Sequence, residues 1–194
     1  YSVSGNGEAC VRPGCDAVGS DGRLTIPSTI FIVESHDFYD CSDLKLLLFQ
    51  QPSQIKTIEE SAFSESGLVS VSLPSSLTSV GANAFRSSKS LINLSFDEPS
   101  QMQTIGETAF YETALTAVSL PASLHGIEYG AFGVMDTLVN VYFRCGSSPI
   151  DIDNSAFYNT QVNTLALPLS AIYGNTRTEL TCSAAGADCS SSSD

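Results

Sequence analysis

Histidine and cysteine are the side chains here whose types could support nucleophilic, acid–base or metal chemistry, and both are scarce. The 194 residues contain two histidines, His36 and His125, and six cysteines. Neither histidine lies near a cysteine in a zinc-ligand spacing such as C-x-x-C. The sequence also has no G-x-S-x-G motif, no phosphate-binding glycine loop and no EF-hand spacing. We therefore expect a protein that is not an enzyme, with no catalytic residues, no metal site and no cofactors.

Acidic side chains are the second group with possible chemistry, since a row of carboxylates can bind calcium. Glutamate or aspartate recurs one residue after an Ile or Val, but Gly81 and Gly106 interrupt the row, so we do not expect a calcium site. The net charge of -13 comes from acids spread along the chain, and the eight Lys and Arg residues are scattered singly. Without a basic patch to neutralise phosphates, nucleic acid is not an expected partner. The recurring acids are Glu34, Glu59, Glu128 and Asp153.

The elements that carry these residues repeat along the chain. A short unit of 22 residues alternates with a long unit of 25, and two apolar positions recur every 47 residues. The extra residues of the long unit fall before and after the expected strand, so the apolar positions keep their register. This pattern predicts a solenoid, in which each unit adds one layer and equivalent side chains stack. The first apolar position holds Ile26, Leu73, Leu120 and Leu167, each before a proline, and the second holds Phe49, Phe96 and Phe143.

Side-chain periods within each unit predict its secondary structure. An alternating triplet such as Val71-Ser72-Leu73 has the two-residue period of a half-buried strand. Acids such as Glu59 and Glu60 precede an Ala-Phe pair, and acids favour the N-terminus of a short helix. We predict an α/β solenoid of about seven stacked parallel strands, with short helices or turns on the opposite wall. The Ala-Phe pair is expected to point inward from that wall.

Three segments are expected along the chain. Residues 1–22 lack the repeat and hold two cysteines, which indicates an N-terminal cap over the open end of the solenoid. Residues 23–172 form the solenoid, and residues 173–194 form a C-terminal cap and a Ser-rich tail. The two histidines then lie three to four repeats apart, too far to share a metal ion or a proton.

The six cysteines divide between the two ends of the chain, three at each end. Cys41 and Cys145 lie about four layers apart, beyond the reach of a disulfide bond. We expect one bond within each end, which leaves Cys41 as a buried free thiol and Cys145 unpaired. Alternatively, these leftover thiols bond neighbouring molecules. The two expected bonds are Cys10–Cys15 and Cys182–Cys189.

The repeat itself resembles a known family. The stretches VSLPSSLTSVGANAF (residues 71–85) and VSLPASLHGIEYGAF (residues 118–132) are similar to the BspA-like subclass of leucine-rich repeats, found on surface proteins of bacteria and protists. The resemblance covers roughly residues 24–172 and implies a protein-binding or adhesive role without shared catalytic residues. That family often has a cysteine three residues after the phenylalanine, and here only Cys41 keeps it. The other copies have Ser66, Ser88, Thr113, Met135 and Thr160.

The outward face of the strands is the expected binding surface, because curved solenoids usually bind their partners there. Its middle is small and weakly polar, with an apolar spot at one end and Tyr142, a frequent type of interface anchor, at the other. Alternatively, the N-terminal cap covers the leucines of the apolar spot and Tyr142 is incidental. Asn93-Leu-Ser95 is an N-glycosylation sequon on this face, and a glycan there would compete with a partner. The candidate partner-binding residues are Leu46, Leu48, Asn93, Ser95, Ser119, Asn140, Tyr142 and Thr164.

These features together predict a non-enzymatic leucine-rich-repeat module, secreted or at the cell surface, that binds a protein or glycan partner for recognition or adhesion. The alternative is a structural subunit that binds copies of itself to build a filament, coat or matrix. Six cysteines and a chain that begins at Tyr1 favour a processed extracellular protein. No run of about 18 apolar residues exists, so no membrane span is expected.

Overall fold

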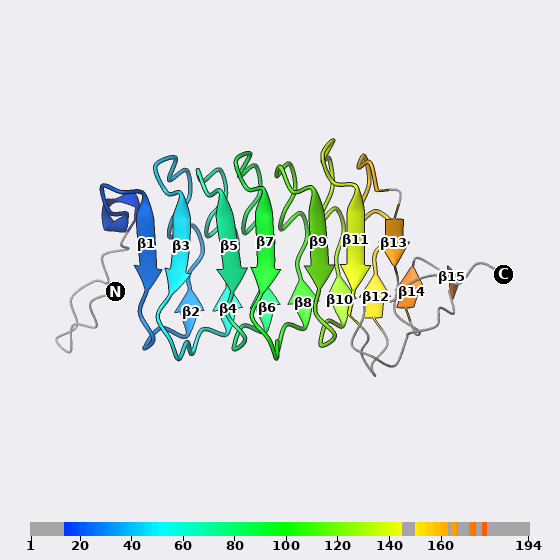
Figure 1. The fold of residues 1–194 in the computed structure, drawn as a ribbon, viewed down its shortest axis with the longest axis horizontal. Helices are drawn as coiled ribbons and strands as arrows, with labels where there is room; N and C mark the ends of the chain where they lie inside the picture. The colour runs from blue at the N-terminus through cyan, green and yellow to red at the C-terminus, as the bar shows by residue number, and fades with distance from the viewer. Residues whose placement is uncertain (1–13, 145–149, 163, 167–170, 174–175, 178–194) are drawn as a thin grey trace.

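The computed structural model describes residues 14–144, 150–162, 164–166, 171–173 and 176–177, and their side chains as far as residue 162. The chain winds into a parallel β-solenoid, with a row of long strands and a row of short strands running side by side along its long axis (Figure 1). The expected solenoid architecture is confirmed. Almost no helix is present in the described residues, where the single helical element is the 3-10 turn η1 (Cys15–Ala17).

The long strands form one wall. Parallel pairing joins them in the order of the sequence, and the two sheets of this wall adjoin at β7 and β9. Side chains alternate between buried and exposed, as Val71 and Leu73 point inward while Ser72 points outward. This is the two-residue period on which the strand prediction rested. The long strands are β1 (Arg23–Ile26), β3 (Leu46–Phe49), β5 (Ser70–Leu73), β7 (Asn93–Phe96), β9 (Ala117–Leu120), β11 (Asn140–Phe143) and β13 (Thr164–Ala166).

The short strands form the second wall, the short-strand sheet. Val33 pairs with Ile58, Ile58 with Val80 and Val80 with Ile105, so paired positions lie 25, 22 and 25 residues apart along the chain. The strands of this sheet are β2 (Ile32–Val33), β4 (Thr57–Ile58), β6 (Ser79–Val80), β8 (Thr104–Ile105), β10 (Gly126–Ile127), β12 (Ile150–Ile152) and β14 (Ala171–Tyr173), all parallel, and β15 (Thr176–Arg177), antiparallel to β14.

The third wall, here called the turn wall, connects each short strand to the next long strand and consists of turns. The short helices that the acids suggested are absent from the described part of this wall, so the predicted α/β class is wrong for these residues, and the turns that were the stated alternative are found instead. Two residues with left-handed backbone flank each phenylalanine of this wall from Phe38 to Phe132, as Ser61 (φ 56°) and Glu65 (φ 59°) flank Phe63, and such residues interrupt a right-handed helix. The Phe63 N–H instead donates to Ala84 O in the next layer, at 2.7 Å. Hydrogen bonds between layers therefore replace those within a helix.

Phenylalanine rings from the turn wall stack through the core. Their centroids lie 5.1–5.5 Å apart, with interplanar angles of 3–11°. Leu73 and Leu120 belong to the same continuous core cluster, with Phe96 packed against it. One stacked core confirms that equivalent side chains lie over one another. The ring column is Phe38, Phe63, Phe85, Phe110, Phe132 and Phe157, beside the fully buried Ala62, Ala84, Ala109, Ala131 and Ala156.

A disulfide bond joins Cys15 to Cys41, with Cα atoms 5.2 Å apart. The expected Cys10–Cys15 bond is therefore wrong, and so is the free thiol expected at Cys41, although Cys41 is buried as predicted. The reason is that η1 folds back against the first layer, which brings Cys15 beside a repeat position 26 residues away. Cys10, Cys145, Cys182 and Cys189 lie outside the described residues, so the Cys182–Cys189 bond stays a prediction.

Candidate binding surface on the long strands

The outward side chains of the long strands form one face, here called the long-strand face. Its two outward columns follow from the strand register, which pairs Leu46 with Ser70 and Ser70 with Asn93 in one column. Ser119 and Tyr142 pair in the other column. The structure thus brings the predicted residues onto one surface. Leu48, Asn93 and Ser95 are exposed, Leu46, Ser119, Asn140 and Tyr142 are half-buried, and Thr164 lies on β13 with its side chain outside the description.

The apolar spot and the aromatic residue occupy opposite ends of this face. Leu48 on β3 is 38% exposed, so its side chain is open to a partner. Tyr142 on β11 lies four strand spacings away, which is roughly 19 Å at the usual distance between paired strands. A ligand that contacts both residues must therefore span most of the described strand wall.

Hydroxyl groups in the middle of the long-strand face form hydrogen bonds with each other. Ser95 Oγ donates to Ser72 Oγ at 3.0 Å, and Ser72 Oγ donates to the Asp97 carboxylate at 2.6 Å. The alternation of the strand residues predicted Ser72 to point outward, but sequence reasoning missed Asp97 as a member of this surface. The signal available was serine at outward positions of two neighbouring units, followed by an acid at the end of the second strand. The chain of hydrogen bonds fixes these side chains in place before a partner arrives.

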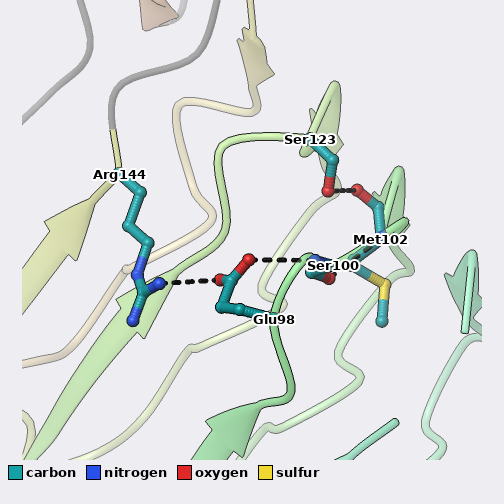
Figure 2. Close-up of polar contacts among 5 residues, drawn as sticks. All are labelled: Glu98, Ser100, Met102, Ser123 and Arg144. Carbon is teal, nitrogen blue, oxygen red and sulfur yellow. Dashed lines mark hydrogen bonds and ion pairs between the residues drawn. The ribbon is translucent and has the colours of Figure 1, made fainter. Parts of the chain in front are cut away.

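Figure 2 shows the polar contacts at one rim of the long-strand face. Arg144, just after β11, places Nη1 3.0 Å from Glu98 Oε1, and the other carboxylate oxygen of Glu98 accepts the Ser100 N–H at 2.9 Å. Ser123 Oγ donates to the carbonyl of the buried Met102 at 2.7 Å. Both charged side chains are about half exposed, so the ion pair contributes at most about 1 kcal/mol. Its main effect is to hold the loop after β7 against the end of β11.

The two histidines lie on separate parts of the solenoid. His36 lies on the turn wall, with its ring centroid 5.9 Å from that of Tyr39. His125 precedes β10, and its Nδ1 lies 2.6 Å from Ser123 O. Within the described residues, no group of three or more His, Cys, Asp or Glu side chains is arranged to hold a metal ion. The search for a membrane span, over the same part of the chain, finds no helix with the length and apolarity to cross a bilayer.

A family model for the BspA type leucine rich repeat region matches this chain in six copies, over residues 21–139 and 103–178. The chain belongs to the BspA-type leucine-rich repeat family. No protein among the curated ones matches the sequence. The match extends past residue 172, where the repeat was expected to end.

Solved structures of other repeat proteins are similar to this BspA-type chain. The pneumococcal vaccine antigen PcpA shares 31% identity over 63% of this chain, with a TM-score of 0.61. A leucine rich cell surface protein of Faecalibacterium prausnitzii A2-165 shares 17% identity, covering 77% of this chain and 61% of that one, with a TM-score of 0.45. A leucine-rich repeat protein of Bacteroides ovatus ATCC 8483 shares 14%, covering 77% and 73%, with a TM-score of 0.29. The chain spans 30% of PcpA.

The position three residues after the phenylalanine faces the interior of the BspA-type repeats. In the copies where serine or threonine replaces cysteine, the hydroxyl group meets another hydroxyl group or a backbone carbonyl. Ser66 Oγ lies 3.0 Å from Ser88 Oγ, and both side chains are buried. Thr113 Oγ1 donates to Phe110 O at 3.0 Å. These hydrogen bonds satisfy polar groups that would otherwise be costly to bury, which explains why small hydroxyl residues replace cysteine here.

Proposed function

We propose that this chain is a non-enzymatic binding module, secreted or at the cell surface, whose long-strand face recognises a protein or glycan partner in recognition or adhesion. The observation that carries the proposal is the open, regular face itself, with Leu48 exposed at one end, Tyr142 half-buried at the other and hydrogen-bonded hydroxyl groups between them. Membership of a leucine-rich repeat family supports it.

Preorganisation is the physical reason why this face suits recognition. Its side chains stand on paired strands, and Ser72 is already held between Ser95 and Asp97. Binding to such a surface orders few additional groups, so less of the contact energy is lost to entropy. Tyr142 supplies a large, rigid contact, the kind of residue that dominates binding energy in many interfaces.

The proposed binding module comprises the whole chain. We propose that its solenoid contains about seven layers, with units of 22 and 25 residues in alternation. Residues 1–22 and 173–194 are the proposed caps, and the Cys15–Cys41 bond supports the first of them because it ties that segment to the first layer. A partner would approach between these caps, over the exposed strands.

Binding measurements with matched variants test the role of the face. Crosslinking to the extracellular fraction of the native source identifies a partner, and calorimetry then compares the wild type with Tyr142→Ala and with the double variant Leu46→Ser, Leu48→Ser. We expect each to weaken binding by about tenfold or more. Tyr39→Ala, an exposed tyrosine on the turn wall, is the control and should bind normally. Equal affinity of all variants would rule out the long-strand face.

The sequon on this face offers a second, independent check. Asn93 is the first residue of β7, and its side chain is exposed between the outward positions of β5 and β9. A glycan attached there would cover the middle of the face and exclude a broad partner. Mass spectrometry of native material should therefore find Asn93 unmodified if the face binds a large protein, and a modified Asn93 would confine the partner to one end.

One observation favours the structural-subunit alternative. Phe31 is 55% exposed and Ile32 is 44% exposed; Ile32 begins β2, the strand at one end of the short-strand sheet in the described chain, and Phe31 directly precedes it. An end strand with exposed apolar residues favours pairing with another copy. Light scattering of the native protein distinguishes the two functions, since large regular assemblies that dissolve in a Phe31→Ser, Ile32→Thr variant would favour the subunit, and a monomer would oppose it.

A further inference from the structure

A hollow of about 400 Å³ opens on the outside of the short-strand sheet at β10. The outward positions of neighbouring strands hold Thr57, Ser79 and Thr104, and a glycine takes the next place, at Gly126. A methyl group built on Gly126 would come no closer than 3.8 Å to its nearest neighbour, a Thr104 methyl carbon. The missing side chain therefore leaves room on an otherwise filled surface.

Tyr129 lines the side of this hollow that borders the turn wall. Its side chain is 48% exposed, and its ring centroid lies 5.7 Å from that of Tyr158, which in turn lies 6.2 Å from Tyr111. Tyr158 reaches both rings because Gly133 has no side chain. A Cβ atom on Gly133 would lie 2.8 Å from Cε1 of Tyr158. The three tyrosines thus form one aromatic group that continues from the hollow across the turn wall.

One ring of this group already binds a cation within the chain. The guanidinium carbon of Arg86 lies 5.0 Å from the ring centroid of Tyr111, within the range of a cation–π interaction. Tyr129, at the other end of the group, has no such cation in the described part of the chain. Tyr111, at one end of the aromatic group, therefore carries a cation, whereas the ring of Tyr129, at the other end, carries none in the described residues.

The hollow is acidic. Three carboxylates and one histidine, His125, line it, and neither lysine nor arginine does. None of the three forms an ion pair within the described residues, although Glu128 accepts the Glu107 N–H and Asp153 accepts the Ser155 N–H. These carboxylates belong to no group that could hold a metal ion there. An organic cation, broad and partly apolar, fits this combination of aromatic ring and separated charges better than a metal ion does. The carboxylates are Glu128, Asp151 and Asp153.

We infer that this acidic tyrosine hollow binds an arginine side chain presented by a basic segment of a partner protein. The guanidinium would stack on Tyr129, as Arg86 stacks on Tyr111, while the carboxylates accept its N–H groups. The hollow lies on the short-strand sheet and not on the long-strand face, so this inference does not depend on the proposed function. The two surfaces could bind different partners at the same time.

Three peptides of equal length test the inference, one carrying arginines, one lysines in their place and one citrullines, which keep the shape of arginine without its charge. The chain has seven tyrosines and no tryptophan, so tyrosine fluorescence reports binding directly, and calorimetry gives the affinity. We expect the arginine peptide to bind best and the citrulline peptide to bind at least tenfold more weakly. Equal binding of arginine and citrulline peptides would overturn the inference, and so would tighter binding of a neutral oligosaccharide.

Variants locate the binding on the protein. Tyr129→Ala and the pair Asp151→Asn, Asp153→Asn should each weaken the arginine peptide by about tenfold, while Tyr39→Ala, an exposed tyrosine elsewhere on the turn wall, should not. Gly126→Val fills the hollow without removing a charge and should also block binding. Thermal unfolding of each variant checks that the fold is intact. Unchanged affinity in folded Tyr129→Ala or Gly126→Val protein would place the cation elsewhere and refute the inference.

Discussion

The ring of Phe85 lies 5.1 Å from the ring of Phe110, and the two planes are within 3° of parallel. Both rings are fully buried, and each belongs to a different layer of the solenoid. Every layer thus completes the core of its neighbours, because a single layer cannot bury a ring on both faces. Removal of one ring should therefore weaken the packing of its own layer and of the two adjacent layers.

Replacing Phe85 by alanine tests the ring column. The change removes ring contacts on both sides and leaves a cavity, and we expect the free energy of unfolding to fall by about 3–5 kcal/mol. Urea titration followed by circular dichroism measures this change. Phe31→Ala is the matched control, since Phe31 is 55% exposed and its removal should cost less than about 0.5 kcal/mol. Similar losses in both variants would show that the stack does not hold the layers together.

The Cys15–Cys41 bond should stabilise the N-terminal end. It closes a loop of 26 residues, and a loop of this size corresponds to roughly 3–4 kcal/mol. Cys15→Ala should lower the free energy of unfolding by about that amount. Reductant should lower the free energy of unfolding of the wild type by about that amount more than it lowers that of the variant, because the wild type alone loses the Cys15–Cys41 bond. Mass spectrometry of unreduced fragments checks the pairing, and a fragment that links Cys10 to Cys15 would contradict it.

Two glycines of the short-strand region offer a contrast between close packing and open space. A Cβ atom at Gly106 would lie 2.8 Å from Ala82 N and 2.8 Å from the carbonyl carbon of Gly81, both backbone atoms of the preceding layer. Gly106→Ala should therefore push the layers apart and cost about 1–3 kcal/mol. Gly126→Ala, where the nearest atom is 3.8 Å away, should change the free energy of unfolding by less than about 0.5 kcal/mol. The reverse order in urea titrations would refute the close approach of the layers at Gly106.

Tyr39 and Tyr158 should ionise at a higher pH than an ordinary tyrosine. The hydrogen bond from Tyr39 to Glu65, 2.7 Å long, and the charge of that carboxylate raise the pKa of Tyr39 above 10.0. Interaction with the Tyr111 hydroxyl and burial raise the pKa of Tyr158 further. Since the folded protein holds these protons more tightly than the unfolded chain, their contribution to stability is complete below pH 10.0 and falls as the pH rises above it.

Phenolate absorbance as a function of pH checks the order of ionisation. Glu65→Gln should bring the pKa of Tyr39 back toward 10.0, and Tyr158→Phe should remove the latest-ionising component. A titration of Glu65→Gln that coincides with that of the wild type would contradict the assigned cause.

The repeat spacing predicted most of the fold because it encodes which side chains stack. Alternation in Val71-Ser72-Leu73 located a long strand, and the recurring Ala-Phe pair located the inward-facing turn wall. The choice between helix and turn could not be made from the sequence. Ser61 and Glu65 adopt left-handed backbone although neither residue type signals it, because hydrogen bonds to the next layer fix their conformation.

The surface features were only partly predictable for a related reason. Outward strand residues such as Asn93 follow from the two-residue period, and the structure places them as expected on one face. Contacts that skip a layer do not follow from it. Tyr158 meets Tyr111 two layers away because Gly133 happens to leave the space between them. The Cys15–Cys41 bond was missed in the same way, since the path of a cap segment without repeats leaves no periodic signal.

Backbone hydrogen bonds between layers run along the long axis of the solenoid, while the covalent chain winds around it (Figure 1). Tension applied to the two ends therefore peels one turn at a time and does not shear many bonds at once. Each turn of 22 residues that detaches adds roughly 75 Å of extended chain, in place of the roughly 5 Å that it occupied in the stack. Under force the module should lengthen in many small steps, and each step should dissipate part of the mechanical work.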